Sequence, residues 1–168
     1  MTRMMEPMVA EFSQEAKTTE RVLAKVPGDK LAWKPHAKSL SLGQLALHIA
    51  TIPGNISKML QADAHEIDPN AFRFGDPKNA EEIRSTFQQS TKDAEAFLSG
   101  LSEAQAMANW TLKSSGKAVF SMPRVNVIRM IMMSHVYHHR GQLSVYLRLL
   151  DVPVPSIYGP SADENPFA

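Results

Sequence analysis

Apolar residues recur every three or four positions in four long stretches of the chain, which is the spacing of one face of an amphipathic α-helix. The first stretch runs from about Glu6 to Val26 and ends at Pro27 and Gly28. Its stripe consists of Val9, Phe12, Ala16, Thr19, Leu23 and Val26. Three more helices are predicted at about 41–59, 79–101 and 123–150. Together they predict one all-α domain over residues 1–168, an antiparallel four-helix bundle.

Two of these helices begin at residues that favour a helix start. Ser41 and Gln44 have the spacing of a capping box, in which each side chain bonds the backbone amide of the other residue. Asn79 and Glu82 have the same spacing at the start of the third helix. Pro53 lies inside the second helix and has no amide hydrogen to donate, so we expect a kink there.

The segments between the helices are longer than a plain up-and-down bundle needs. Residues 63–78 are polar and rich in turn formers, and residues 109–122 fit either a small hairpin or an extended excursion. Residues 151–168 form a proline-rich tail that is either an ordered cap or a frayed end. We expect the long connections to carry part of the function.

Composition excludes several classes of protein. The chain has 168 residues, of which 43% are hydrophobic and 21% are charged, which is typical of a globular fold. No apolar run approaches the ~18 residues of a membrane span, and the N-terminus lacks the apolar core of a secretory signal. Lysine and arginine number 18 against 17 acidic residues, so we expect neither a nucleic-acid nor a membrane partner. The chain has no cysteine, which excludes disulfides and thiolate sites and fits a cytoplasmic location.

Polar residues interrupt the apolar stripe of the last helix. Its ends are apolar, but its middle carries two imidazoles and an amide, which are costly to bury without partners. Histidines four residues apart lie one turn apart on one helix face, so both can reach a single metal ion. In order, the stripe reads Ile128, Met132, His135, His139, Gln142, Tyr146 and Leu149.

The histidines allow other interpretations. His135 could share an ion with His138 instead, although His139 continues the apolar stripe and His138 points to the flank. Buried histidines also often bond one another or a backbone carbonyl without any metal. His48, on the inner face of the second helix, is the candidate third ligand, or else a core histidine. His36 and His65 lie in loop-like sequence and are expected to be solvated.

Several segments of the sequence resemble the DinB family, a group of DinB/YfiT-like four-helix bundles regarded as metalloenzymes. The resemblance is carried by His135-x3-His139-Arg140-Gly141-Gln142 after an apolar run, and by Ser41-Leu42-Gly43-Gln44-Leu45-Ala46-Leu47-His48. Trp33-Lys34-Pro35 and the segment from Val152 to Pro160 are similar as well. The resemblance implies a divalent ion, usually zinc or nickel, held by His48, His135 and His139. It also implies relatives that are thiol-dependent S-transferases or an isomerase using bacillithiol or mycothiol, beside many whose substrates are unknown.

Three functions fit these features. The first is a metal-dependent enzyme, a thiol-dependent S-transferase or a hydrolase, acting on a small molecule. Gln142 and Tyr146 are its candidate catalytic residues, although Gln142 also suits a bond to a ligand imidazole and Tyr146 suits core packing. Arg140 leaves the stripe and could pair with a substrate carboxylate, but it is expected to be a surface or interface charge. The second function is a non-catalytic metal-binding or stress-response protein with a structural ion. The third is a ligand-binding regulator whose pocket is lined by methionines such as Met130, Met132 and Met133.

The expected partners are a small-molecule substrate, which could be a low-molecular-weight thiol, and a second copy of the chain. A homodimer is suggested by the family resemblance and by the apolar flank of the last helix. That flank consists of Val127, Ile131 and Tyr137, with His138.

Overall fold

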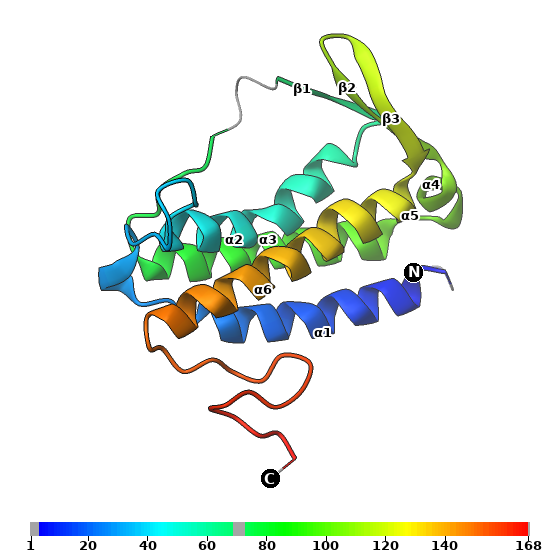
Figure 1. Cartoon of the computed structure of the whole chain (residues 1–168). Helices are drawn as coiled ribbons and strands as arrows, with labels where there is room; N and C mark the ends of the chain where they lie inside the picture. The colour runs from blue at the N-terminus through cyan, green and yellow to red at the C-terminus, as the bar shows by residue number, and fades with distance from the viewer. Residues whose placement is uncertain (1–3, 69–72, 168) are drawn as a thin grey trace.

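Four long helical segments form the body of the protein in a computed structural model that describes residues 4–68 and 73–167 (Figure 1). The fourth segment is continuous but contains a π-helical stretch, which periodicity alone did not predict. The chain is therefore mostly helical, as the sequence predicts. The segments are α1 (Met5–Leu23), α2 (Leu42–Met59), α3 (Ala80–Gly100), and α5 (Arg124–Val127) with η2 (Ile128–Met133) and α6 (Ser134–Leu149).

The helices α2 and α3 run in the same direction, which differs from the expected antiparallel arrangement. Gly43 near the start of α2 lies against Pro77, just before α3. Further along, the Gly54 amide donates to Ser90 Oγ of α3 at 2.7 Å. The long connection between α2 and α3 accounts for this, since the chain crosses back over the length of the molecule before α3 begins (Figure 1). The antiparallel neighbour of α2 is instead α6.

Local sequence signals fix the starts of α2 and α3. Ser41 and Gln44 form both bonds of the capping box. The Asn79 side chain accepts from the Glu82 amide at 2.8 Å, whereas the Glu82 carboxylate accepts from Lys78, so only half of the second box forms. Pro53 lies inside α2, and the amide that follows it is satisfied by α3 rather than left unpaired.

A three-stranded sheet at one end of the helices was not part of the all-α prediction (Figure 1). Its order is β1 (Ala64–Ile67), β2 (Asn109–Ser114) and β3 (Lys117–Pro123), with β1 parallel and β3 antiparallel to β2. The strands β2 and β3 form the hairpin that the sequence allowed, joined by Ser115 and Gly116. Both turn residues have positive φ angles, 51° and 74°, as a type I′ turn requires. Two short helices, η1 (Gly28–Lys30) and α4 (Glu103–Met107), complete the described elements.

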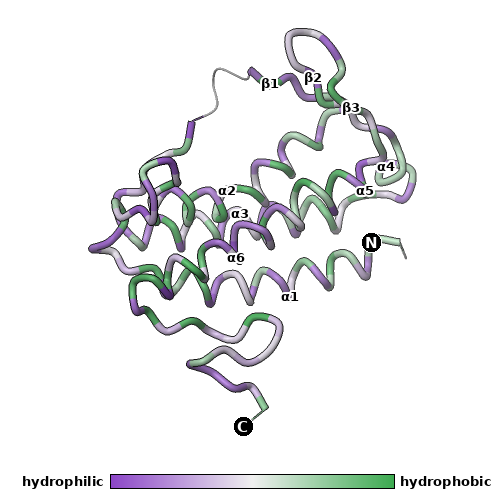
Figure 2. The backbone as a smooth tube through the Cα atoms, in the orientation of Figure 1, coloured by the Kyte–Doolittle hydropathy of each residue, from purple (hydrophilic) through white to green (hydrophobic). Residues whose placement is uncertain are grey.

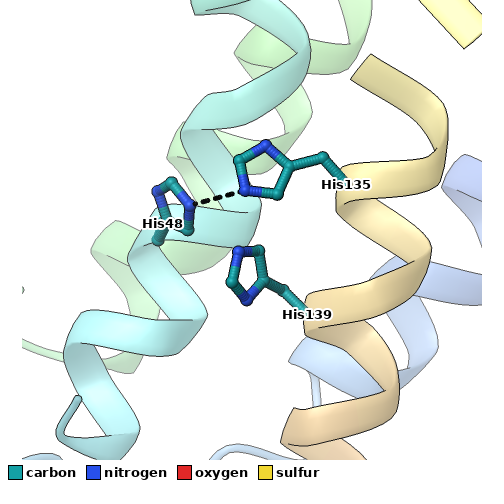
Figure 3. Close-up of side chains that lie close together, drawn as sticks. All are labelled: His48, His135 and His139. Carbon is teal, nitrogen blue, oxygen red and sulfur yellow. Dashed lines mark hydrogen bonds between the residues drawn. The ribbon is translucent and has the colours of Figure 1, made fainter. Parts of the chain in front are cut away.

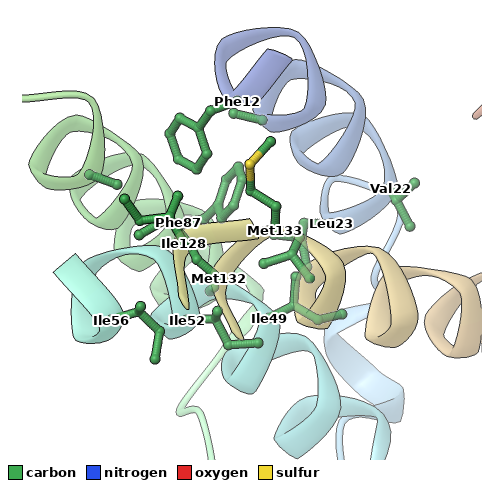
Figure 4. Packing of buried hydrophobic residues seen from close by; sticks show 14 of the residues in the cluster. Phe12, Val22, Leu23, Ile49, Ile52, Ile56, Phe87, Ile128, Met132 and Met133 are labelled. Atoms are coloured by element: carbon green, nitrogen blue, oxygen red, sulfur yellow. The ribbon is translucent and has the colours of Figure 1, made fainter. Parts of the chain in front are cut away.

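The core lies between the four helical segments (Figure 4). Hydrophobic and hydrophilic positions alternate along each helix, as amphipathic packing requires (Figure 2). Met132 and Met133 are buried in this core, whereas Met130 is 57% exposed. Met132 and Met133 therefore fill space in the interior, whereas Met130 faces outward, so the three methionines do not line a pocket as a group. No helix within residues 4–68 and 73–167 combines the length and apolar character that crossing a bilayer demands.

Arg140 is buried, so the expectation of a surface charge is wrong. Its side chain is 1% exposed and pairs with the Glu15 carboxylate of α1 at 2.7 Å. The guanidinium also donates to Thr19 Oγ1 and to the Tyr158 hydroxyl in the tail. The cause is that α1 and the tail cover a second side of α6. The tail is thus an ordered cap over most of its length.

The expected dimer flank is also partly interior. Val127 is 1% exposed and belongs to the core. Tyr137 is half-buried, and its hydroxyl donates to Glu11 of α1. Both residues make their contacts within a single chain, and Val127 is too deeply buried to contact a partner subunit.

Candidate metal centre

Three histidine rings from two helices converge on one point between α2 and α6 (Figure 3). His48 comes from α2, and His135 and His139 come from successive turns of α6. One ring nitrogen from each residue lies within 4.8 Å of the others. The structure therefore brings together the three residues singled out in the sequence, and the cluster is compatible with a metal ion.

The spacing of the nitrogens suits a transition-metal ion. The Nε2 atoms of His48 and His135 are 3.4 Å apart. An ion held tetrahedrally by bonds of about 2.1 Å separates two ligand nitrogens by roughly 3.4 Å, so an ion fits between them without rearrangement of these two rings. The same distance also permits a weak hydrogen bond between the imidazoles, which is the metal-free alternative.

A hydrogen bond on the outer nitrogen orients the His139 ring. The Nδ1 atom of His139 donates to Gln142 Oε1 at 2.7 Å. A bond of this kind fixes the tautomer of a histidine and leaves its other nitrogen free to bind a metal. Gln142 was considered above either as a catalytic residue or as a hydrogen-bond partner of a ligand imidazole. The structure shows it bonded to one of the clustered imidazoles.

The cluster favours neutral imidazoles. Burial, together with repulsion from positive charge on His139 and His135, lowers the pKa of His48 to about 4. Burial likewise lowers the pKa values of His135 and His139. Neutral imidazole is the form that binds a metal. At neutral pH the three rings are therefore ready to act as ligands.

This electrostatic arrangement predicts an acid-sensitive metal-free protein. The folded-state pKa of His48 lies below the value near 6.5 of an unfolded chain, so the unfolded state binds more protons between those values. The free energy of unfolding should hold above pH 6.5 and decrease as the pH falls from 6.5 towards 4. Thermal melting of the metal-free protein across this range measures the decrease. His48→Gln should flatten it, and an unchanged pH profile in that variant would contradict the prediction.

The other singled-out residues lie outside the cluster. His138 is exposed, and His36 is exposed with its Nδ1 accepting from the Lys38 amide. The Tyr146 hydroxyl donates to the Leu40 carbonyl at 3.3 Å, and its ring packs edge-on against Trp33. His65 was predicted to be a solvated loop residue. It is instead half-buried, belongs to β1 and lines a cavity.

That cavity opens beside the histidine cluster and has a volume of about 450 Å³. His48 and His135 form part of its wall. Trp110 and Leu112 of β2 and Ile52 and Ile56 of α2 contribute apolar surface. A cavity of this size is within the usual range for a small-molecule site.

Sequence reasoning missed three contributors to the site. Phe74, from the long connection, packs edge-on against the His48 ring with centroids 5.0 Å apart. Trp110 of β2 lines the cavity together with His65 of β1, the strand that pairs with β2. The π-helical η2 directly precedes the His135 turn, and π-helical turns are frequent at functional sites. The apolar run 130–133 gave no signal that distinguishes a π-helical turn from an α-helical one.

Comparison with known proteins identifies one family. A model of the DinB family matches residues 1–166. The chain is 25% identical to the uncharacterized protein YrdA of Bacillus subtilis (strain 168), and the alignment covers 98% of this chain and 93% of that protein.

Two solved structures share the fold. A DinB-like protein from Bacillus cereus ATCC 10987 has a TM-score of 0.69 and 20% identity, covering 89% of this chain and 94% of its own. The DinB-like protein YjoA from Bacillus subtilis has a TM-score of 0.69 and 20% identity, covering 90% and 98%. At this level of identity the likeness concerns the fold, so activity has to be argued from the site.

Proposed function

The chain belongs to the DinB family, and from that premise we propose that it is an enzyme dependent on a divalent metal held by His48, His135 and His139. The proposed reaction is transfer to or from a thiol, or hydrolysis, of a small molecule bound in the cavity beside the cluster. The proposed ion is zinc or nickel.

One observation carries this proposal: three imidazole nitrogens converge beside a cavity large enough for a substrate, and His48 and His135 form part of its wall. An all-nitrogen donor set suits zinc and nickel. Three protein ligands leave a further coordination position open, as catalytic zinc sites do and closed structural sites do not. When bound, such an ion supplies Lewis-acid activation of a water molecule or a thiol.

The chain's own residues prepare the site. Gln142 accepts the Nδ1 proton of His139 and so directs the other nitrogen of that ring towards the cluster. The apolar wall of the cavity keeps water away from the bound substrate and strengthens electrostatic interactions there. We propose Gln142 as a positioning residue, and Tyr146 has no contact that supports a direct role.

The experiment compares metal-free and metal-loaded protein. After chelation and dialysis, the protein is assayed for folding by circular dichroism and for activity against panels of thiol-transfer and hydrolysis substrates. Retained folding with activity only after zinc or nickel is restored supports the enzyme. Unfolding on metal removal, with no activity in either form, would favour the alternative in which the ion is structural.

We also propose a homodimer in the cytoplasm, with the four helical segments forming a DinB/YfiT-like bundle. The available surface is the exposed side of α6, where Val145 and Leu149 are 56% and 57% exposed and His138 is exposed too. We expect light scattering at micromolar concentration to give twice the mass of the chain. Leu149→Glu should halve that mass, and a monomer in the unmodified protein would contradict the proposal.

A further inference from the structure

A second cavity lies between the ends of α2 and α3, the short helix α4 and the first turn of α5. Figure 1 shows α4 and α5 at the end of the molecule that carries the hairpin. The volume of this cavity is about 610 Å³, which is within the usual range for a small-molecule site. The three clustered histidines do not belong to its lining, so it is separate from the candidate metal centre.

Apolar side chains form most of the wall of this second cavity. Three of them are alanines, whose small size lets a ligand approach the backbone of α3 and α4 closely. An apolar group placed against this wall would gain by leaving water. The apolar part of the lining consists of Leu60, Ala96, Phe97, Leu101, Ala104 and Ala108.

A buried guanidinium, that of Arg124, lies in the same wall and is 5% exposed. Its Nε atom donates to the Leu60 carbonyl at 3.1 Å, and its Nη2 atom donates to the Ala62 carbonyl at 3.0 Å and pairs with Asp63. Among the described residues, Nη1 has one acceptor, the Gln105 carbonyl, at 3.5 Å. That contact is longer than an ordinary N–H···O hydrogen bond, and Nη1 carries two hydrogens. Arg124 therefore has capacity for another acceptor on Nη1.

The carboxylate that pairs with Arg124 lies almost entirely in water. The Asp63 side chain is 94% exposed, whereas that of Arg124 is 6% exposed. Asp63 thus loses little burial when it turns away, but the buried guanidinium still needs an anion beside it. The carboxylate of a ligand can supply that anion by taking the place of Asp63 on Nη2 and by accepting from Nη1 as well. This is the two-bond geometry in which arginine prefers to bind a carboxylate.

We propose that this cavity binds a small organic anion, a monocarboxylate with an apolar body. Its carboxylate pairs with Arg124, and its body lies against the alanine-rich wall of α3 and α4. Asp63 and Arg124 are the charged side chains among the described residues of the lining, so a positive charge remains in the wall when Asp63 turns to solvent. The proposed metal takes no part in this site, which is independent of the proposed function.

A matched pair of ligands tests the chemical class. Benzoate and benzamide have nearly the same shape, and they differ in charge and in the ability to accept two bonds from one guanidinium. We expect benzoate to shift the backbone amide signals of Ala104 and Ala108 in NMR spectra of the ¹⁵N-labelled full chain. Titration should show benzamide binding at least about tenfold more weakly.

A change at Asp63 should strengthen binding, which damage to the fold would not do. Asp63→Asn removes the carboxylate that competes for Arg124, so benzoate should bind at least about threefold more tightly while benzamide is unaffected. Asp29→Asn is the matched control, because Asp29 is also an exposed partner in an ion pair, with Lys30. It lies in η1, next to Gly28, which contacts Ala80 at the start of α3 and so at the other end of that helix. This control should leave both affinities unchanged.

A second variant closes the cavity. Gly100 belongs to the lining, and no heavy atom lies within 4 Å of the position that a Cβ atom would take there. Gly100→Leu should therefore fold normally by circular dichroism and bind benzoate at least about tenfold more weakly, because its side chain occupies the space of the ligand. Arg124→Gln should abolish binding, but it also removes the bonds to the Leu60 and Ala62 carbonyls, so Asp63→Asn and Gly100→Leu decide the question if it does not fold.

Three results would each overturn the inference. The first is equal affinity for benzoate and benzamide. The second is benzoate shifts confined to the histidine cluster, which would place the ligand at the other site. The third is unchanged benzoate affinity in Asp63→Asn or in folded Gly100→Leu, since the carboxylate or the body would then lie elsewhere. None of these measurements depends on metal content, so a failure of the proposed function would leave them unaffected.

Discussion

Replacing His48, His135 or His139 with alanine should each remove most of the bound metal, while His138→Ala should leave it nearly intact. Each of the three substitutions removes one of the convergent ring nitrogens, which lie within 4.8 Å of one another. Loss of an outer hydrogen-bond partner alone typically costs about 10–100-fold in metal affinity, so loss of a ligand should cost at least about 100-fold. Elemental analysis of untagged protein measures the bound metal directly.

The neighbouring residues provide graded controls for that series. His138 lies on the same helix, and its ring centroid is 4.9 Å from that of His139, but it is exposed and outside the cluster. Gln142→Ala keeps all three ligands and loses only the bond to His139. Its metal affinity should therefore lie between that of His138→Ala and those of the three ligand variants. Full metal content in His48→Ala or His139→Ala would disprove the site, and loss only in His138→Ala would mean that the wrong face of α6 was chosen.

The histidine cluster was predictable because it obeys helical periodicity. His135 and His139 continue an apolar stripe at steps of three and four residues, and His48 lies on the inner face of a helix whose start is marked by a capping box. Both signals are local, so a single sequence contains them. Their meeting in space needed only that α2 and α6 be neighbours, which the family resemblance supplied.

The sheet and the cavity depend on contacts that leave no local trace. The strand Ala64–Ile67 has four residues, too few for a clear alternation, and it pairs with β2 more than forty positions later in the chain. Without that pairing His65 reads as a loop residue and Trp110 as one end of a hairpin. Residues of both strands line the cavity, so the cavity could not be inferred before the fold was known.

Arg140→Ala should lower the free energy of unfolding by about 3 kcal/mol, because it breaks a buried ion pair and leaves the other partner uncompensated. The sequence suggested a surface charge because helical periodicity assigns a helix only one buried face. In the structure α1 supplies Glu15 and Thr19, and the tail supplies Tyr158, on a second side of α6. For a chain of this size the loss corresponds to a melting temperature lower by about 6–12 °C.

Two further variants separate the ion pair from the other bonds of Arg140. Tyr158→Phe removes two hydrogen bonds, one accepted from Arg140 and one donated to Glu15, at a residue that is 71% exposed, and should lower stability by no more than about 1 kcal/mol. Adding Glu15→Ala to Arg140→Ala should recover part of the loss, since the carboxylate that lacks a partner is then gone. A melting temperature within about 2 °C of the unmodified protein for Arg140→Ala would show that the pair contributes little. We also expect Arg140→Ala to bind a normal amount of metal below its melting temperature. Arg140 holds α6 against α1 and the tail, on the side of the helix that His135 and His139 do not occupy.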